Sequence, residues 1–276
     1  MIPIRMTEYP DIETPLPAVL RGKLRTEVFG RYHIEFLAKT GSTNAVAIGL
    51  AERGAAEGVI VIADVQASGR GQMGRGWHSP GGVGVYLSII VRPPFPPREA
   101  PSINLIASIA VAESLPGVEP GAITIKWPND VLINGRKVSG ILSEMRVNDD
   151  RIDFGIVGIG INVNNAGGSF PPEISATATS ILIETGAPAN RSAVVRSVLE
   201  SFERHYRTMI SSGAGPILKR WESLSGFMGR RIRAVDPGVV ITGVASGMDL
   251  NGHLKITDEE RREHILVSGD IEVIGD

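Results

Sequence analysis

The sequence predicts an α/β (α+β) fold in which a mixed-sheet domain is followed by a small β-barrel. Up to about residue 224, valine- and isoleucine-rich runs alternate with helical patterns, and after it come short alternating runs separated by turns. The 276 residues, 42% of them hydrophobic, are enough to bury a sizeable core. We therefore expect an N-terminal extension over 1–30, a main domain over 31–224 and a small domain over 225–276.

The first half of the main domain alternates strands with helices. YHIEFLAKT predicts a strand, and residues 42–53 predict a helix that begins with Ser42 or Thr43 as its capping residue. GVIVIADVQA predicts a buried strand, which a glycine-rich loop connects to the strand VYLSIIVRP. Residues 98–115 predict a core helix. We expect four of its apolar residues on one side: Ile103, Ile106, Ala110 and Val111.

The second half contains the two clearest local signals. Strand-like runs flank Asn134 and Gly135, a dipeptide favoured in type I′ hairpin turns because both positions need positive φ. DFGIVGIGINV predicts a further strand. Residues 190–212 predict an amphipathic helix, because apolar residues recur there at steps of three and four. These residues are Val194, Val195, Val198, Leu199, Phe202, Tyr206 and Met209.

Composition excludes several classes of protein. The absence of cysteine excludes disulfides, thiolate zinc sites and thiol nucleophiles, and it suits a reducing compartment. A net charge of −2 gives no bulk reason to expect a nucleic-acid partner. No apolar run reaches 18 residues and no signal peptide is visible, so we expect a cytoplasmic protein without a membrane partner. The five histidines lack paired metal-ligand spacing, and neither Ser79 nor Ser88 lies in a G-x-S-x-G motif.

A glycine-rich loop from Gly69 to Trp77 contains a literal G-x-G-x-x-G. In a dinucleotide-binding fold a helix must follow this motif, whereas here a strand follows, and the chain also lacks a P-loop. Any nucleotide must therefore be held differently. Backbone N–H groups together with Arg70 and Arg75 suit the binding of carboxylate or phosphate oxygens. The alternative is a surface hairpin loop with two solvated arginines.

Two further segments place polar groups at strand ends. KWPND, from Lys126 to Asp130, suits a binding site but also ordinary turn chemistry, and Lys126 equally suits a structural ion pair. Lys137 lies two residues past the hairpin turn, where it can project from a rigid strand into a cleft, although most lysines are solvated. GIGIN, ending at Asn162, permits close approach of a flat ring or tight strand packing.

In series, these segments resemble the biotin protein ligase family. The matching segments are STN at 42–44, Gln66, GRGQMGRGW with SPGG, KWPND, NGRKVSGIL and GIGINVN. The resemblance covers about residues 32–276 and implies a sheet domain related to class II aminoacyl-tRNA synthetases. It makes 31–224 the catalytic biotin- and ATP-binding domain and 225–276 an SH3-like domain. It further implies that biotin and MgATP form biotinyl-5′-AMP, from which biotin passes to a lysine of a biotin carboxyl carrier protein.

The resemblance also implies a role for individual residues. Lys137 and Arg70 would be catalytic, because cationic donors offset the repulsion between a carboxylate and a triphosphate. The implied biotin contacts are Ser42, Thr43, Asn44, Gln66, Gly69, Arg70, Gly71, Gln72, Lys137 and Gly140. The implied ATP contacts are Arg75, Trp77, Asn129, Asp130 and Asn162. No metal site built from protein groups alone is expected, since Mg²⁺ would enter with ATP.

One departure and two alternatives remain. Gln72 stands where many members of the family have a second arginine, which leaves the grip of the loop open. Some members carry an N-terminal DNA-binding domain, and about thirty residues cannot house one, so no DNA-repressor activity is expected. A lipoate protein ligase and a non-catalytic biotin-binding protein are the alternatives. GRGxxGR with KWPND favours biotin, and a monomer and a homodimer both fit the sequence.

Overall fold

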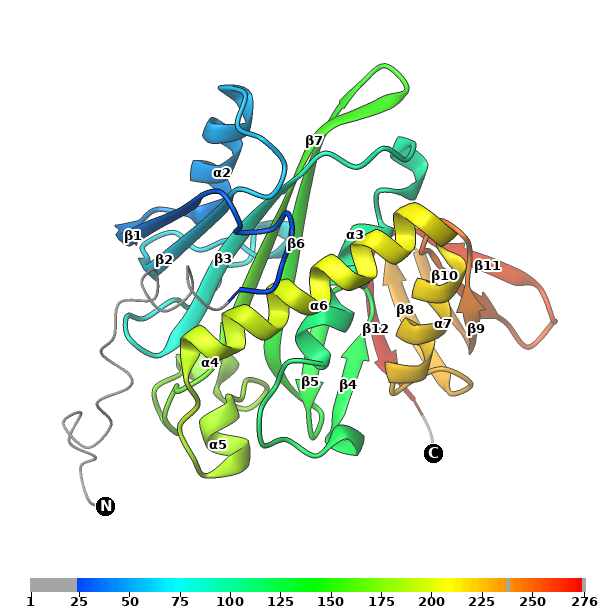
Figure 1. The fold of residues 1–276 in the computed structure, drawn as a ribbon. Helices are drawn as coiled ribbons and strands as arrows, with labels where there is room; N and C mark the ends of the chain where they lie inside the picture. The colour runs from blue at the N-terminus through cyan, green and yellow to red at the C-terminus, as the bar shows by residue number, and fades with distance from the viewer. Residues whose placement is uncertain (1–23, 237–238, 275–276) are drawn as a thin grey trace.

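The computed structural model describes residues 24–236 and 239–274, so most of the extension expected over 1–30 lies outside the described residues. The described chain contains a seven-stranded mixed sheet and a five-stranded antiparallel sheet, as Figure 1 shows. The predicted α/β fold with a β-rich C-terminal part is confirmed. No helix in these two ranges combines the length and apolar composition that crossing a membrane requires.

The large sheet is built around two long neighbouring strands, β6 and β7. Its strands, in spatial order, are β1 (Ile34–Thr40), β2 (Ile60–Gln66), β3 (Gly84–Val91), β7 (Arg151–Asn162), β6 (Arg136–Asn148), β5 (Asp130–Ile133) and β4 (Ile123–Lys126). β1 and β2 are parallel and the other neighbours are antiparallel. The turn between β5 and β6 has φ of 50° at Asn134 and 76° at Gly135, which confirms the predicted hairpin.

Helices cover both faces of this sheet. Helix α2 (Thr43–Glu52) packs over one face in a core cluster of its own, whereas α3 (Ser102–Ala112) and α6 (Arg191–Ser212) belong to the main core on the other face. The apolar stripe predicted for α6 is buried throughout. The short helices α4 (Pro172–Ser175) and α5 (Ile181–Thr185) follow β7. Single 3₁₀ turns occupy Gln72–Gly74, Pro97–Glu99 and Pro120–Ala122.

Two helices differ from expectation. Helix α3 is shorter than the predicted 98–115 and is buried on nearly all sides rather than one, because it lies between the sheet and the helices α6 and α7. Helix α7 (Gly215–Leu224) was not predicted. It begins with Pro216 in its first turn, a position that proline favours, and it buries Ile217, Leu218 and Trp221.

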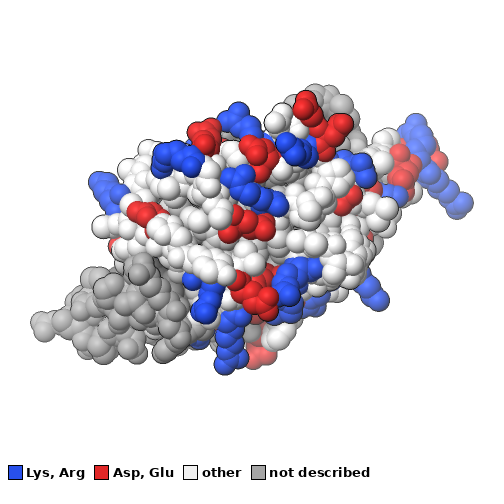
Figure 2. Space-filling view, turned by 45° about the horizontal axis from the view of Figure 1, so that its top comes forward, with Lys and Arg blue, Asp and Glu red and all other residues white. Residues whose placement is uncertain are grey.

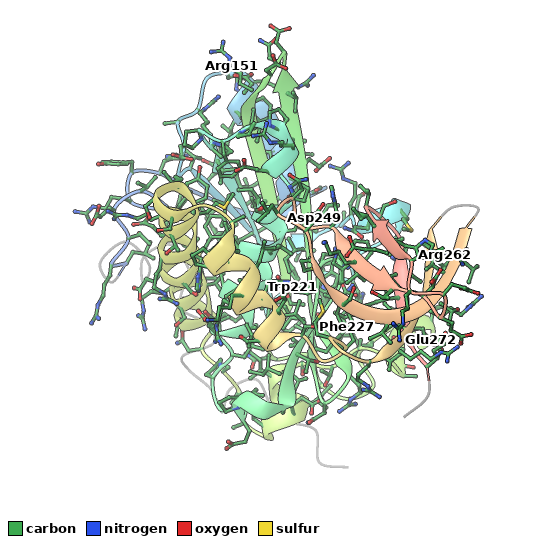
Figure 3. All side chains as sticks on the ribbon, turned by 90° about the vertical axis from the view of Figure 1, so that its right-hand side faces the viewer. Arg151, Trp221, Phe227, Asp249, Arg262 and Glu272 are labelled. Atoms are coloured by element: carbon green, nitrogen blue, oxygen red, sulfur yellow. The ribbon has the colours of Figure 1, made fainter. Side chains whose placement is uncertain are left out.

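The small sheet packs against the end of α7. Its strands, in spatial order, are β11 (Glu263–Leu266), β10 (Leu254–Thr257), β9 (Val239–Met248), β8 (Arg231–Asp236) and β12 (Asp270–Val273). The Trp221 and Phe227 rings meet edge to face with centroids 6.0 Å apart. Figure 3 labels both residues near the junction of helix α7 and this sheet. Apolar residues of the small sheet, such as Ile232 and Leu254, belong to the main core. A domain boundary near residue 224 remains a prediction.

A carboxylate joins three helices beside this junction. Glu113, which follows α3 directly, accepts hydrogen bonds from Ser201 and Arg204 of α6, lies 2.9 Å from His205 Nε2, and accepts a bond from Arg220 of α7. Burial alone would raise the pKa of Glu113, but the hydrogen bonds from His205, Ser201 and Arg220 hold it well below its usual range.

The surface charges are mixed. Figure 2 shows acidic and basic side chains interspersed over one face of the molecule.

Replacing Glu113 by alanine should destabilise the fold. We expect the free energy of unfolding at pH 7 to fall by about 2 kcal/mol, which lies between the values for exposed and for buried ion pairs, because the side chains of Arg204 and Arg220 reach solvent. Because the pKa of Glu113 is lower in the folded state, the ionised carboxylate stabilises the fold at pH values above its ordinary pKa. The difference in unfolding free energy between the variant and wild type should therefore shrink as the pH falls below about 4. Urea denaturation across pH measures this. Glu259→Ala, at an exposed pair with Arg231, should change stability little.

Candidate functional site

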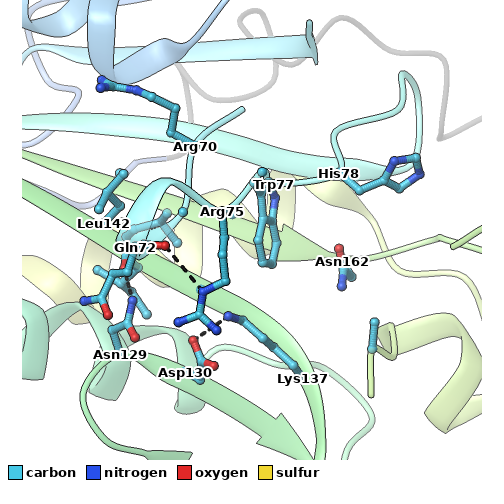
Figure 4. A pocket seen from close by; sticks show the side chains of 18 of the residues that line it. Arg70, Gln72, Arg75, Trp77, His78, Asn129, Asp130, Lys137, Leu142 and Asn162 are labelled. Atoms are coloured by element: carbon cyan, nitrogen blue, oxygen red, sulfur yellow. Dashed lines mark hydrogen bonds and ion pairs between the residues drawn. The ribbon is translucent and has the colours of Figure 1, made fainter. Parts of the chain in front are cut away.

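A cavity of about 620 Å³ lies over strands β6 and β7, beneath the 69–77 loop. Nearly all of the predicted site residues line it (Figure 4): Ser42, Thr43, Asn44, Gln66, Arg70, Gly71, Gln72, Arg75, Trp77, Asn129, Asp130, Lys137, Gly140 and Asn162. Gly69 is the exception. A Cβ atom on Gly69 would lie 2.5 Å from the carbonyl oxygen of Trp77, so this glycine permits the close packing of the loop on itself.

Glycines form the part of the floor on which two side chains rest. A Cβ atom on Gly158 would lie 2.3 Å from Asn44 Oδ1, and one on Gly160 would lie 2.3 Å from Trp77 Nε1. On the neighbouring strand, a Cβ atom on Gly140 would lie 3.1 Å from the Trp77 ring. The flat ring that approaches the GIGIN segment is therefore the chain's own Trp77.

The start of α2 is held by an amide and hydroxyl network. Both the backbone N–H and the hydroxyl of Thr43 donate to Gln66 Oε1, over 2.9 and 3.1 Å. Gln66 Nε2 in turn donates to Ser79 Oγ over 3.0 Å. Asn44 Nδ2 donates to Glu144 Oε2 over 2.7 Å. Ser42 occupies the N-cap position, as one of the two predicted capping residues, but its side chain makes no capping hydrogen bond.

The 69–77 loop carries its two arginines in different environments. Arg70 Nη2 lies 3.1 Å from Glu144 Oε2, and Figure 4 shows Arg70 pointing away from Lys137 and Asp130. Arg75 lies above the cavity, where its Nε donates to the Gln72 carbonyl over 3.4 Å. The loop thus brings two guanidinium groups to the cavity lining in different orientations, which suits a ligand with anionic groups.

The opposite wall carries two lysines, each paired with an aspartate. Lys137 Nζ lies 2.6 Å from Asp130 Oδ1 and 5.6 Å from the centroid of the Trp77 ring. Lys126 Nζ lies 2.8 Å from Asp270 Oδ1, so the ion pair proposed for Lys126 from sequence exists. Both lysine side chains are 35% exposed. These paired cations remain accessible to an anionic ligand.

Sequence analysis missed part of the lining. The additional residues include His78, Phe170, Ile174, Thr177, Ala178 and Asp270. Those from 170 to 178 lie in the segment after β7, and Asp270 begins β12 of the small sheet. Burial would raise the pKa of Asp270, but Lys126 and Arg75 lower it below its usual range. His78 lies between the GRGQMGRGW and SPGG segments, but no short motif marks Asp270 or the residues from 170 to 178, so only the fold could bring those to the cavity.

Comparison with known proteins decides the family. The model of the biotin/lipoate A/B protein ligase family matches residues 37–162. The bifunctional ligase/repressor BirA of Bacillus subtilis is 40% identical over 254 residues, which cover 92% of this chain and 78% of BirA. The biotin–[acetyl-CoA-carboxylase] ligase of Mycobacterium tuberculosis is 34% identical over 274 residues, covering 96% and 98% of the two chains. This chain belongs to the biotin protein ligase family.

The structural comparison agrees with this assignment. A biotin protein ligase from Aquifex aeolicus, solved in complex with biotin and ATP, has a TM-score of 0.72 and 29% sequence identity, covering 89% of this ligase and 100% of that chain. The ligase is therefore an enzyme of this family, with its mixed α/β fold and C-terminal antiparallel sheet. Roles of individual residues in the cavity remain proposals.

Adding a methyl group to Gly160 should displace Trp77. The new Cβ atom would overlap the indole nitrogen, so we expect Gly160→Ala to push the ring and its loop outward. Trp127 and Trp221 are buried, so acrylamide quenching of tryptophan fluorescence should rise as Trp77 becomes more exposed. Gly167→Ala is the control, because a Cβ atom there meets open space. Equal quenching of both variants would contradict the predicted displacement.

Proposed function

We propose that this ligase joins biotin to ATP as biotinyl-5′-AMP and then transfers the biotin to a lysine of a biotin carboxyl carrier protein. The observation that carries the proposal is a single cavity in which the Thr43–Gln66 network, the arginine loop and Lys137 meet. The Aquifex relative was solved with biotin and ATP, and the Mycobacterium relative is named for acetyl-CoA carboxylase. These names support the substrates and the acceptor proposed here.

The polar network at the start of α2 suits the ureido ring of biotin. A ureido group presents two N–H donors and one carbonyl acceptor, and hydroxyl and amide side chains supply partners for both kinds. Thr43, Asn44 and Gln66 offer such groups in fixed positions. The other end of the cavity, lined by Trp77, Asn129, Asp130 and Asn162, would then hold ATP.

The chemistry requires cations at the meeting point of the two substrates. An oxygen of the biotin carboxylate attacks the α-phosphorus of ATP, and pyrophosphate leaves. The amine of the acceptor lysine then attacks the biotinyl carbonyl carbon, and AMP leaves. Lys137 and Arg75 would offset the negative charge in the first step, with Lys137 exchanging Asp130 for a phosphate oxygen. Arg70 would have to turn from Glu144 toward the substrates.

Mg²⁺ would accompany ATP and shield its phosphates. Such sites hold the ion with one or two carboxylates plus phosphate oxygens. The described residues contain no cluster of three or more potential metal-ligating side chains, and Asp130 is a cavity carboxylate that fits the smaller requirement. We also propose that the ligase is cytoplasmic. We further propose that it does not bind operator DNA, which a gel shift with operator DNA would check.

The direct test is transfer of labelled biotin to a purified carrier domain. We expect labelling that requires ATP and that excess lipoate does not reduce. Competition by lipoate would favour a lipoate ligase instead. Tight binding of biotin without any labelling, at all ATP concentrations, would favour a non-catalytic biotin-binding protein.

Replacing Lys137 by alanine should impair adenylation more than biotin binding. We expect biotin-dependent exchange between ATP and pyrophosphate to fall about a hundredfold or more, the usual effect of removing one donor to a developing negative charge. Calorimetry should show a biotin Kd within about threefold of wild type, because the proposed ureido contacts lie at the other end of the cavity. Equal loss of both, or normal exchange, would remove Lys137 from this role.

Gln72→Arg should lengthen retention of biotinyl-5′-AMP. A guanidinium at this cavity position can form a charge-assisted hydrogen bond, worth about 1.5 kcal/mol, so we expect release to slow by about tenfold. Rapid dilution of the loaded enzyme measures the release rate. Met73→Arg adds the same charge one residue later, at an exposed side chain outside the cavity, and should leave the rate near wild type.

A further inference from the structure

Glu184 on helix α5 is a carboxylate almost removed from solvent. Its side chain is 6% exposed. It accepts hydrogen bonds from Arg136 Nη2 over 2.6 Å, from Asn134 Nδ2 over 2.8 Å and from the hydroxyl of Thr179. Burial would raise the pKa of Glu184, but these three donors together lower it below its usual range. The group is therefore a charged acceptor at neutral pH.

The donors come from two pieces of chain that flank Lys137. Asn134 belongs to the hairpin turn and Arg136 is the residue before Lys137. Thr179 belongs to the segment after β7, whose backbone pairs with Lys137 itself. The N–H of Lys137 donates to the Thr177 carbonyl over 2.7 Å, and the N–H of Thr179 donates to the Lys137 carbonyl over 2.9 Å.

Segment 177–179 takes the place of β7 as the neighbour of the first residues of β6. The register between β6 and β7 begins at Ser139 opposite Ile161, so β7 does not reach Lys137. Segment 177–179 continues the sheet there as a parallel bridge to Lys137. Asn162 at the end of β7 fixes the same segment, because its Nδ2 donates to the Thr179 carbonyl over 2.9 Å. The backbone of Lys137 thus depends on a segment that is tied down by side chains.

We propose that Glu184 is a positioning residue, which holds Lys137 in register by joining the β5–β6 hairpin to segment 177–179. Glu184 does not line the cavity and acts only through the backbone of Lys137. A lysine side chain has four rotatable bonds, so its ammonium group stays beside Asp130 only if the backbone below it is fixed. The role in catalysis rests on the proposed function of Lys137.

Glu184→Gln tests the role with little change in shape. The amide keeps one acceptor oxygen, but its NH₂ group opposes the donors, and the charge is lost. We expect kcat for ATP–pyrophosphate exchange to fall by about tenfold, since misplacement by about 1 Å can cost two orders of magnitude. KM values for biotin and ATP should stay within about threefold. A change confined to KM would overturn the proposal.

Glu113→Gln is the matched control. Glu113 is likewise a carboxylate with several donors and a lowered pKa, and its side chain is 18% exposed, but it joins α3, α6 and α7 and does not line the cavity. Both variants should lose stability, and at a temperature where both are folded only Glu184→Gln should lose kcat. Equal loss of kcat in the two variants would show a general effect of destabilisation and contradict the positioning role.

A double-mutant cycle with Lys137→Ala isolates the route. If Glu184 acts through Lys137, then Glu184→Gln should reduce exchange no further once the Lys137 ammonium is gone. Losses that multiply in the double variant would mean that Glu184 acts elsewhere.

Hydrogen exchange supplies a readout that needs no activity. In Glu184→Gln the amides of Lys137 and Thr179 should exchange faster, because their bonds form the bridge that Glu184 secures. If both amides kept their protection from hydrogen exchange, the positioning role of Glu184 would be contradicted. If these amides exchanged faster in Glu184→Gln but the wild type showed no ATP–pyrophosphate exchange, Glu184 would still hold the backbone of Lys137. The proposed function would then be refuted instead.

Discussion

The site depends on the close approach of two side chains to a strand that carries no side chains at the points of contact. Gly158 accepts Asn44 and Gly160 accepts Trp77 at distances that a Cβ atom would forbid. The first contact fixes the start of α2, and the second fixes the end of the glycine-rich loop above the same sheet. The absence of side chains at Gly158 and Gly160 of β7 therefore determines where the start of α2 and the glycine-rich loop can lie.

The cations around the cavity are neutralised in advance. The pairs are Arg70 with Glu144, Lys126 with Asp270, and Lys137 with Asp130. A partly buried cation without a counterion destabilises the folded state, so these carboxylates lower that penalty when no anionic ligand is bound. The arrangement also means that a ligand gains affinity only from the difference between its own contacts and those it replaces.

Local chemistry explains which features could be predicted. The hairpin at Asn134 and Gly135 and the stripe of helix α6 follow from turn geometry and periodicity alone, and the structure contains both. Nearly all of the residues that the ordered motifs nominated line the cavity, although they make up only part of its lining. Asp270 and the residues from 170 to 178 reach it through long-range packing, which leaves no local pattern, and the same holds for Glu184 beneath Lys137. Helix α7 offers only three buried apolar residues, too few for a clear period.

Asp270 brings the C-terminal sheet into the wall of a cavity that is otherwise lined by the large sheet and the loops and helices attached to it. Its partners Lys126 and Arg75 lie far away along the chain, on separate elements. Cutting the chain near residue 224 would therefore leave a lysine without its counterion as well as an uncovered apolar surface. A C-terminal sheet taken from a relative would preserve this pair only if it also carried an acidic residue opposite Lys126.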